Sequence, residues 1–366
     1  MEVPVSAGKT TGFAFTSECR ESSRPQRIRR EQDVRHSVGR VVHLITYVAR
    51  RSLESIPLLL FISLIFFAIL HNVPGGPLAP YLQNPHITAA DIIRLKHNLG
   101  LDQPVSVQYF SWLSRVVRGD LGYSTSNSEP VLQAILERMP ATLILMGSAI
   151  VVSLLVGVTA GLIAALRPYS AVDYAITTFA FFGQSMPVFW FALMLQLAFA
   201  VNGISGFGYQ LRLPSAGMCA DDACPWWDIL DHLVLPTTVL SLFYVATWSR
   251  FIRSSMLEVL RADYMRTAAA KGLTRTRVVL GHGLKNALNP LVTVVALALP
   301  GLVGGAVITE QIFAWPGMGR LFYSALGQFD FALLMGYLMM VSVLVVLCNL
   351  LADIGYAILD PRVSYE

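Results

Sequence analysis

The sequence predicts an all-α polytopic membrane protein with six transmembrane helices and a small helical cap after the first of them. Composition is the first reason, because 54% of the 366 residues are hydrophobic and only 14% are charged, against about 25% charged in ordinary soluble domains. Patterning is the second reason, because the apolar residues form long runs without Asp, Glu, Lys or Arg. A helix of about 20 such residues is long enough to cross a bilayer.

Six charge-free runs set the positions of the spans. They cover residues 55–90, 139–166, 174–211, 233–249, 286–309 and 331–352. A backbone in lipid must satisfy its own hydrogen bonds, so each run is expected to contain a helix. The spans themselves are expected at about 55–72, 140–166, 172–202, 232–248, 288–312 and 331–351.

The chain is expected to fall into four regions. These are a tail at 1–40, a basic lead-in with the first span at 41–72, the cap at 73–139, and a core with the other five spans at 140–363, which includes a basic region at 250–287. The tail is polar and rich in arginine, which predicts disorder. Within the cap, Thr88 and Asp91 have the spacing of a helix-capping pair, and an apolar face predicts a second helix over about 105–117.

The distribution of basic residues predicts the orientation of the chain. Lys and Arg gather on the cytoplasmic side of membrane proteins, and six spans place both termini on one side. If both termini are inside, most of the 27 basic residues lie on the inner side, including those of the tail and of the basic region. We therefore expect cytoplasmic termini and an outer cap.

Residues 250–290 form a basic, polar stretch between two apolar runs. Only Glu258 and Asp263 oppose its eight basic residues, which are Arg250, Arg253, Arg261, Arg266, Lys271, Arg275, Arg277 and Lys285. A simple connector between two membrane helices could be far shorter. Helix-forming composition on both sides of Gly272 predicts a helix, a break and a second helix. We expect this surface to receive a separate protein partner.

Polar side chains inside the expected spans are candidates for a route through the membrane. There are seven of them: Gln184, Ser185, Thr237, Thr238, Ser241, Asn289 and Thr293. Packing against a neighbouring helix is the alternative role for each. Gly157 and Gly161, four residues apart, are expected to serve helix packing. Glu310 and residues 315–319 are expected to form an outer turn after the fifth span.

Two cysteines, Cys219 and Cys224, fall in an expected outer loop. An oxidising compartment could link them in a disulfide, and two free thiols are the alternative. The sequence holds no serine-hydrolase motif, phosphate-binding loop or Cys/His metal cluster. We therefore predict no catalytic residue, no metal site and no nucleic-acid partner.

The segment Asp263-Tyr264-Met265-Arg266-Thr267-Ala268-Ala269-Ala270-Lys271-Gly272-Leu273 resembles the cytoplasmic coupling motif of ABC importer permeases, in the version found in the peptide subfamily. Further segments resemble those of dipeptide and oligopeptide permeases of the first-permease type. These segments are 74–77, 119–122, 140–143, 185–190, 284–290, 313–319 and 360–362. The resemblance covers about residues 42–363 and leaves out residues 1–40 and the cysteine pair.

The resemblance implies a type I ABC importer permease fold in the inner, or plasma, membrane of a bacterium, with di- or oligopeptides as cargo. It assigns docking on an ATPase to Arg266, Thr267, Ala268, Ala270, Lys271, Gly272 and Leu273. The implied partners are a second permease, two ATP-binding subunits that hold ATP and Mg²⁺, and an extracytoplasmic substrate-binding protein. This chain itself would hold no cofactor.

Other readings remain open at this point. The same architecture could import nickel, glutathione-like conjugates or haem. A stand-alone secondary transporter is the main alternative of another class, and the lack of Asp, Glu, Lys and Arg in the cores of the runs argues against it. A membrane enzyme would need a polar constellation that the sequence does not show.

Overall fold

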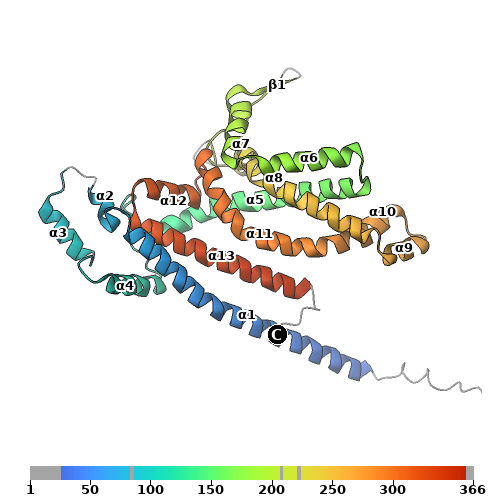
Figure 1. Ribbon diagram of the computed structural model, residues 1–366, viewed down its shortest axis with the longest axis horizontal. Helices are drawn as coiled ribbons and strands as arrows, with labels where there is room; N and C mark the ends of the chain where they lie inside the picture. Colours follow the sequence, from blue (N-terminus) through green and yellow to red (C-terminus); the bar gives the residue numbers. More distant parts are fainter. Residues whose placement is uncertain (1–25, 83–85, 207–208, 221–223, 360–366) are drawn as a thin grey trace, which may run out of the picture. The chain divides into compact units, whose positions relative to one another are not determined.

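The computed structural model of the chain describes residues 26–82, 86–206, 209–220 and 224–359 (Figure 1). The chain divides into two compact units, residues 1–51 and 52–364. Helix α1 (Gln26–His71) runs across the boundary. The predicted tail is therefore helical from Gln26 onward, and its residues 1–25 lie outside the described part.

The second unit is built almost entirely of helices. In chain order it contains η1 (Gly76–Leu78), α2 (Ala79–Leu82), α3 (Ala89–Asn98), α4 (Val105–Val117), α5 (Val131–Leu166), α6 (Ala171–Ser185), α7 (Val188–Leu195), the π-helical η2 (Gln196–Asn202), strands β1 (Ile204–Gly206) and β2 (Tyr209–Leu211), α8 (Trp226–Val259), α9 (Asp263–Ala270), α10 (Arg275–Arg277), the π-helical η3 (Val278–Leu284), α11 (Lys285–Ile312), α12 (Met318–Gly327) and α13 (Phe331–Leu359). The two strands pair antiparallel, with Ser205 opposite Gln210.

Four of the described helices are long and apolar enough to cross a membrane: Val48–His71, Val131–Leu166, Trp226–Val259 and Phe331–Gly355. The bent pair α6 and α7 makes a fifth if it counts as one span. The remaining expected span falls on α11, in which the side chains of residues 300–305 lie outside the described part. The all-α polytopic fold is confirmed, and the count of six spans stays a prediction.

The expected third span is broken. Helices α6 and α7 meet at an angle of 106°, and Pro187 begins the second of them. Proline lacks an N–H and drives the preceding residue out of the helical region, and Met186 is indeed extended at φ −77° and ψ 132°. The sequence pattern placed the span but could not show this bend.

The cap contains both predicted helices. Thr88 caps α3, since its side chain accepts a hydrogen bond from the Asp91 N–H (3.3 Å) and the Asp91 carboxylate accepts one from the Thr88 N–H (3.1 Å). Helix α4 packs its buried Tyr109 and Trp112 against Phe67 of α1. An apolar face thus seats the cap against the first span.

Asp330 ties the cap to the start of α13. Its carboxylate is fully buried and accepts hydrogen bonds from the hydroxyls of Ser124 (2.6 Å) and Ser126 (2.7 Å) and from the Ser126 N–H (3.0 Å). The Leu333 N–H also donates to it (3.1 Å). Burial would raise the pKa of Asp330, but these hydrogen bonds outweigh it and lower the pKa.

Replacing Asp330 by Asn is expected to loosen the cap. Asn has one acceptor oxygen, so its NH2 group would face either the Ser126 N–H or the Leu333 N–H, at a cost of about 1–3 kcal/mol. Hydrogen exchange of residues 119–130 should rise in D330N. Because the folded pKa lies below the unfolded value, the stabilisation is present at neutral pH. It is lost only as the pH falls below about 4. Equal exchange in D330N and the native chain would contradict this role.

A seam of small residues joins α5 to α8. The Ser148 and Thr237 hydroxyls lie 2.7 Å apart, and the Ser153 hydroxyl donates to the Ser241 carbonyl (3.2 Å). Further along, a Cβ on Gly161 would lie 2.5 Å from the carbonyl oxygen of Ser249. Close backbone approach through small residues is a common means of helix association in lipid, and it confirms the packing role expected for Gly161.

Candidate functional site

The basic region folds as a short helix, a turn and a second helical segment. Helix α9 ends at Ala270, and Gly272 follows with φ +78°. This left-handed conformation after a helix end favours glycine. Nothing lies within 4 Å of the place where a Gly272 Cβ would stand. The glycine is therefore required by the backbone conformation of the turn, not by crowding.

Most of the predicted docking residues lie on the outer face of this turn. Those exposed are Arg266, Thr267, Ala270, Lys271 and Gly272. The exposed face has backbone, alanine and basic groups available to a partner. Arg266 has only a long contact with the highly exposed Asp263 (3.5 Å), which leaves its guanidinium accessible.

Ala268 differs from its prediction. It is buried, 8% exposed, and packs with Met265 and Val278. Leu273 is half-buried against the same cluster. A helix of about two turns is stabilised mainly by packing its apolar face against the rest of the protein. In α9 these residues form that face. Ala268 therefore helps to hold α9 in position, and only a small part of its side chain faces outward.

The described part of α8 extends well beyond the expected fourth span. It runs from Trp226 to Val259 and so includes the first ten residues of the basic region. The charge-free run predicts only the segment that can lie in lipid. The helix itself continues into charged residues, because these residues also favour helical structure. Movements of α9 would thus reach the membrane helix directly, because only three residues separate the two elements.

The seven polar candidates do not form one surface. Gln184, Ser185, Thr238 and Asn289 are exposed and Thr293 is half-buried. Ser185 and Thr238 satisfy their hydroxyls on carbonyls of their own helices, Phe181 (2.8 Å) and Val234 (2.7 Å). Because these five side chains are exposed or half-buried on the isolated chain, they remain candidates to line a route.

Thr237 and Ser241 differ from the other five. They are 6% and 4% exposed and belong to the seam between α8 and α5. Their polar atoms bond within the chain, to Ser148 and to the Thr238 carbonyl (3.2 Å). Here the alternative of helix packing describes them better than a route through the membrane.

A buried ion pair joins α6 to α8 next to the basic region. The Arg253 Nε and Nη2 atoms each lie 2.6 Å from a carboxylate oxygen of Asp173. Asp173 is 2% exposed and also accepts a hydrogen bond from the Tyr169 N–H (2.9 Å). Such a two-pronged pair is directional as well as strong. Arg253 therefore forms an ion pair within the chain, although it was among the basic residues expected to face a partner.

Glu310 corrects a second expectation, because it lies within α11 instead of in an outer turn. Its side chain is fully buried. It accepts hydrogen bonds from the Thr142 hydroxyl (2.7 Å) and from the N–H groups of Gly319 (2.7 Å) and Arg320 (3.0 Å). A carboxylate at the first turn of α12 satisfies N–H groups that the helix cannot bond itself. We call these residues the Glu310 hub.

The Glu310 hub explains two glycines of the 315–319 segment. A Cβ on Gly317 would lie 2.3 Å from the Glu310 carboxyl carbon, and one on Gly319 would lie 2.6 Å from the Val307 Cα. Trp315 is fully buried beside them, and its indole N–H donates to the Ala141 carbonyl (2.8 Å). Two segments that seemed unrelated in sequence, 140–143 and 313–319, thus form one structure.

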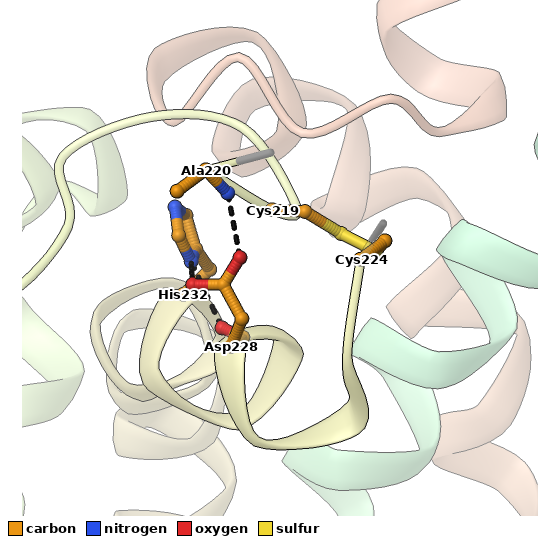
Figure 2. Close-up of a disulfide and its surroundings, with 5 residues drawn as sticks. All are labelled: Cys219, Ala220, Cys224, Asp228 and His232. Carbon is orange, nitrogen blue, oxygen red and sulfur yellow. Dashed lines mark hydrogen bonds and ion pairs between the residues drawn. A yellow bond between two sulfur atoms is a disulfide. The ribbon is translucent and has the colours of Figure 1, made fainter. Parts of the chain in front are cut away.

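The loop before α8 contains the two cysteines (Figure 2). The structure joins Cys219 to Cys224 in a disulfide. The Ala220 N–H donates to the Asp228 carboxylate (2.6 Å), and His232 Nδ1 lies 3.2 Å from the same carboxylate. The Ala220–Asp228 hydrogen bond ties the loop to the first turn of α8, and the disulfide closes the loop just before this helix.

In the described part of the chain, no group of three or more His, Cys, Asp or Glu side chains could hold a metal ion. The buried acids Asp173, Glu310 and Asp330 connect neighbouring elements through hydrogen bonds. Most basic residues of the region 250–290 remain on the surface.

Sequence comparisons identify relatives over nearly the whole chain. Residues 157–365 match the family described as "Binding-protein-dependent transport system inner membrane component", and residues 44–146 match its N-terminal counterpart. The oligopeptide transport system permease protein AppB of Bacillus subtilis is 41% identical over 321 residues, which is 87% of this chain and 99% of the relative. The dipeptide transport system permease protein DppB of Escherichia coli K12 is 36% identical over 338 residues, or 88% and 100% of the two chains.

Among solved structures, the inward-facing MetNI methionine ABC transporter superposes with a TM-score of 0.49 at 18% identity, over 64% of this chain and 99% of the other. The sequence relatives are permease components of transporters. The family match spans more than half of the chain, and the relatives are covered almost in full. This chain is a multi-pass inner membrane protein, and it belongs to the family of binding-protein-dependent transport system inner membrane components.

Proposed function

We propose that this chain is one of two permease subunits of an ABC importer that carries di- or oligopeptides. The second permease would complete the pathway, and two ATPase subunits binding ATP and Mg²⁺ would drive it from the cytoplasm. A substrate-binding protein would deliver cargo on the outer side, where the cap lies. In this arrangement both termini are cytoplasmic.

Two lines of support favour peptides over nickel, glutathione-like conjugates or haem. The relatives named above are an oligopeptide and a dipeptide permease. The segment from Arg266 to Leu273 also resembles the peptide version of the coupling motif. Since a separate binding protein would select the cargo, uptake of labelled peptides is the measurement that decides this point.

The observation that carries the proposal is the exposed turn at the end of α9. Its residues match the coupling motif, and their backbone has the helix, break and helix that docking in a groove requires. Alanine and glycine allow a partner to approach closely, and Arg266 and Lys271 can meet acids there.

The mechanism we propose is alternating access. Closure of the ATPases on ATP would move α9, and α8 and α11 would follow because α9 lies between them in the chain. Packed helices with two discrete arrangements convert small shifts at one end into opening at the other. The exposed candidates Gln184, Ser185, Thr238, Asn289 and Thr293 would then line part of the route.

A stand-alone secondary transporter is less well supported. Such a protein needs an ionisable group within its spans that gains and loses a proton or an ion. Two buried acids, Asp173 and Glu310, lie at the edges of the expected spans, just outside the charge-free runs. Asp173 is paired with Arg253, and Glu310 is bonded to the first turn of α12. Both acids are occupied by contacts that hold the fold together.

Replacing Gly272 by Val is expected to uncouple ATP hydrolysis from transport. A left-handed conformation costs a residue with a Cβ roughly 1–2 kcal/mol, and a β-branched side chain tolerates it least. The turn would rearrange, and docking would lose its geometry. In reconstituted complexes, G272V should hydrolyse ATP but take up peptide several times more slowly than the native complex.

Asparagine is the matched control at this position, because it enters the left-handed region more readily than other residues with a Cβ. No neighbour lies within 4 Å of the Gly272 Cβ position, so G272N differs from G272V in backbone preference and not in crowding. G272N should keep most of the uptake. Normal uptake in G272V would rule out the assigned role of the break.

The partners can be tested by mild detergent extraction of the tagged chain. Recovery of two ATPases and a second permease is the expected result. If the chain is instead recovered alone and stable, the α9 turn has no ATPase partner, and a stand-alone secondary transporter becomes the favoured function.

A further inference from the structure

Two arginines one helical turn apart on α8 have different partners. Arg253 forms the two-pronged pair with Asp173. Arg250 bonds only to a neutral group, the Gln184 side-chain oxygen, at 2.5 Å. Its guanidinium also lies over the Phe181 ring, 4.8 Å from the centroid. Among the described residues, no carboxylate lies within ion-pair distance of Arg250.

The Arg250 side chain points toward the middle of its span. Helix α6 runs antiparallel to α8, because Asp173 meets Arg253 while a Cβ on Gly183 would lie 2.9 Å from Leu242. Gln184 is therefore level with the centre of the span 226–259, and Arg250 reaches toward it. If Arg250 only placed its charge in water or among lipid headgroups, its side chain would extend toward the nearer end of α8. This one extends away from it.

The guanidinium lies beside the break in the third span. Gln184 is the penultimate residue of α6, and the chain turns by 106° immediately after Ser185. Irregular backbone within a membrane is tolerated where it borders protein or a water-filled cavity. Broken helices in transporters commonly border the transported group. Gln184 and Ser185 are both exposed on this chain, so the patch is accessible.

We propose that Arg250 binds a carboxylate of the peptide cargo during its passage, most simply the C-terminal one; this inference rests on the proposed function. A guanidinium has five N–H donors in a planar fork, and Gln184 and Phe181 hold it in place while using few of them. The free donors match a carboxylate in a two-pronged geometry. Lipid headgroups share this chemistry but lie at the span ends, opposite to the direction of the side chain.

The test uses the full reconstituted complex in proteoliposomes with saturating binding protein. Uptake of labelled trialanine is compared with uptake of trialanine amide, which lacks the terminal carboxylate. In R250Q, trialanine uptake should fall about tenfold or more, as expected for a lost charge-assisted hydrogen bond. Uptake of the amide should change by less than about twofold. R250K should fall between the two, since lysine keeps the charge without the fork.

Arg261 provides the matched control, since it is exposed just after the end of α8. R261Q removes the same charge and should not change the ratio of trialanine to amide uptake. Equal loss of both cargos in R250Q, or no loss of either, would overturn the assignment. Loss of the second permease from the R250Q complex would also overturn it, because Arg250 would then pair with that subunit. If the native complex takes up neither probe, the proposed peptide function fails and this inference fails with it.

Discussion

Replacing Gly161 by Ala is expected to destabilise the protein more than the same substitution at Gly147 or Gly157, the other glycines of α5. The new Cβ would stand 2.5 Å from the Ser249 carbonyl oxygen and 2.9 Å from the Ile252 Cβ. A backbone oxygen cannot rotate away as a side chain can, so α5 and α8 would have to separate. Overpacking costs typically 1–3 kcal/mol, and a clash with backbone belongs at the upper end. The melting temperature in detergent should fall on the order of 5 °C.

Gly147 supplies the control in the same helix. No atom lies within 4 Å of its Cβ position, and alanine is favoured over glycine in a helix by roughly 0.5–1 kcal/mol. G147A should therefore melt at the same temperature as the native chain or slightly above it. If G161A and G147A melted together, the close contact between α5 and α8 would be wrong.

The second large effect is expected at the Glu310 hub. Truncation to Ala would remove a carboxylate that accepts three hydrogen bonds. The buried N–H group of Gly319, the partly buried N–H group of Arg320 and the Thr142 hydroxyl would lose their acceptor. Each such loss costs about 1–3 kcal/mol, so E310A should reduce the folded yield severely. Size-exclusion profiles of the tagged chain after heating would measure the loss.

Two further variants distinguish the contribution of the Glu310 hydrogen bonds to stability from that of side-chain volume. E310Q keeps the shape and one acceptor oxygen, so it should retain part of the stability that E310A loses. Q311A shortens the exposed neighbouring side chain and should behave like the native protein. A stable E310A, equal to Q311A in melting temperature, would show that the carboxylate does not organise α12.

The features predictable from the sequence are those set by runs and local patterns. Charge-free stretches placed the membrane helices, because the cost of burying charge in lipid acts on each segment separately. The capping pair at Thr88 placed α3, since its geometry is local to four residues. The turn at Gly272 was predictable for the same reason, as one glycine between helix-forming segments marks a break.

Features that depend on pairing across the chain could not be read in this way. Asp173 and Arg253 are 80 residues apart, and Glu310 is 168 residues from Thr142. Glu310 lay just outside a charge-free run, so the pattern assigned it to a turn. Nothing in the sequence alone distinguishes an acid facing water from one that bonds to a distant helix. The burial of Thr237 and Ser241 could not be predicted for the same reason, because it depends on their packing against α5.

The Asp173–Arg253 pair has a consequence for how the chain is made. The ribosome completes α6 before it begins α8, and 80 residues of synthesis separate the acid from its cation. At about 5–20 residues per second, the nascent chain carries Asp173 without Arg253 for roughly 4–16 s. A carboxylate without a counter-charge favours contact with water over burial, so the first turn of α6 would stay accessible to water during that interval. Its final seating would wait for α8, which makes the order of translation part of the folding route.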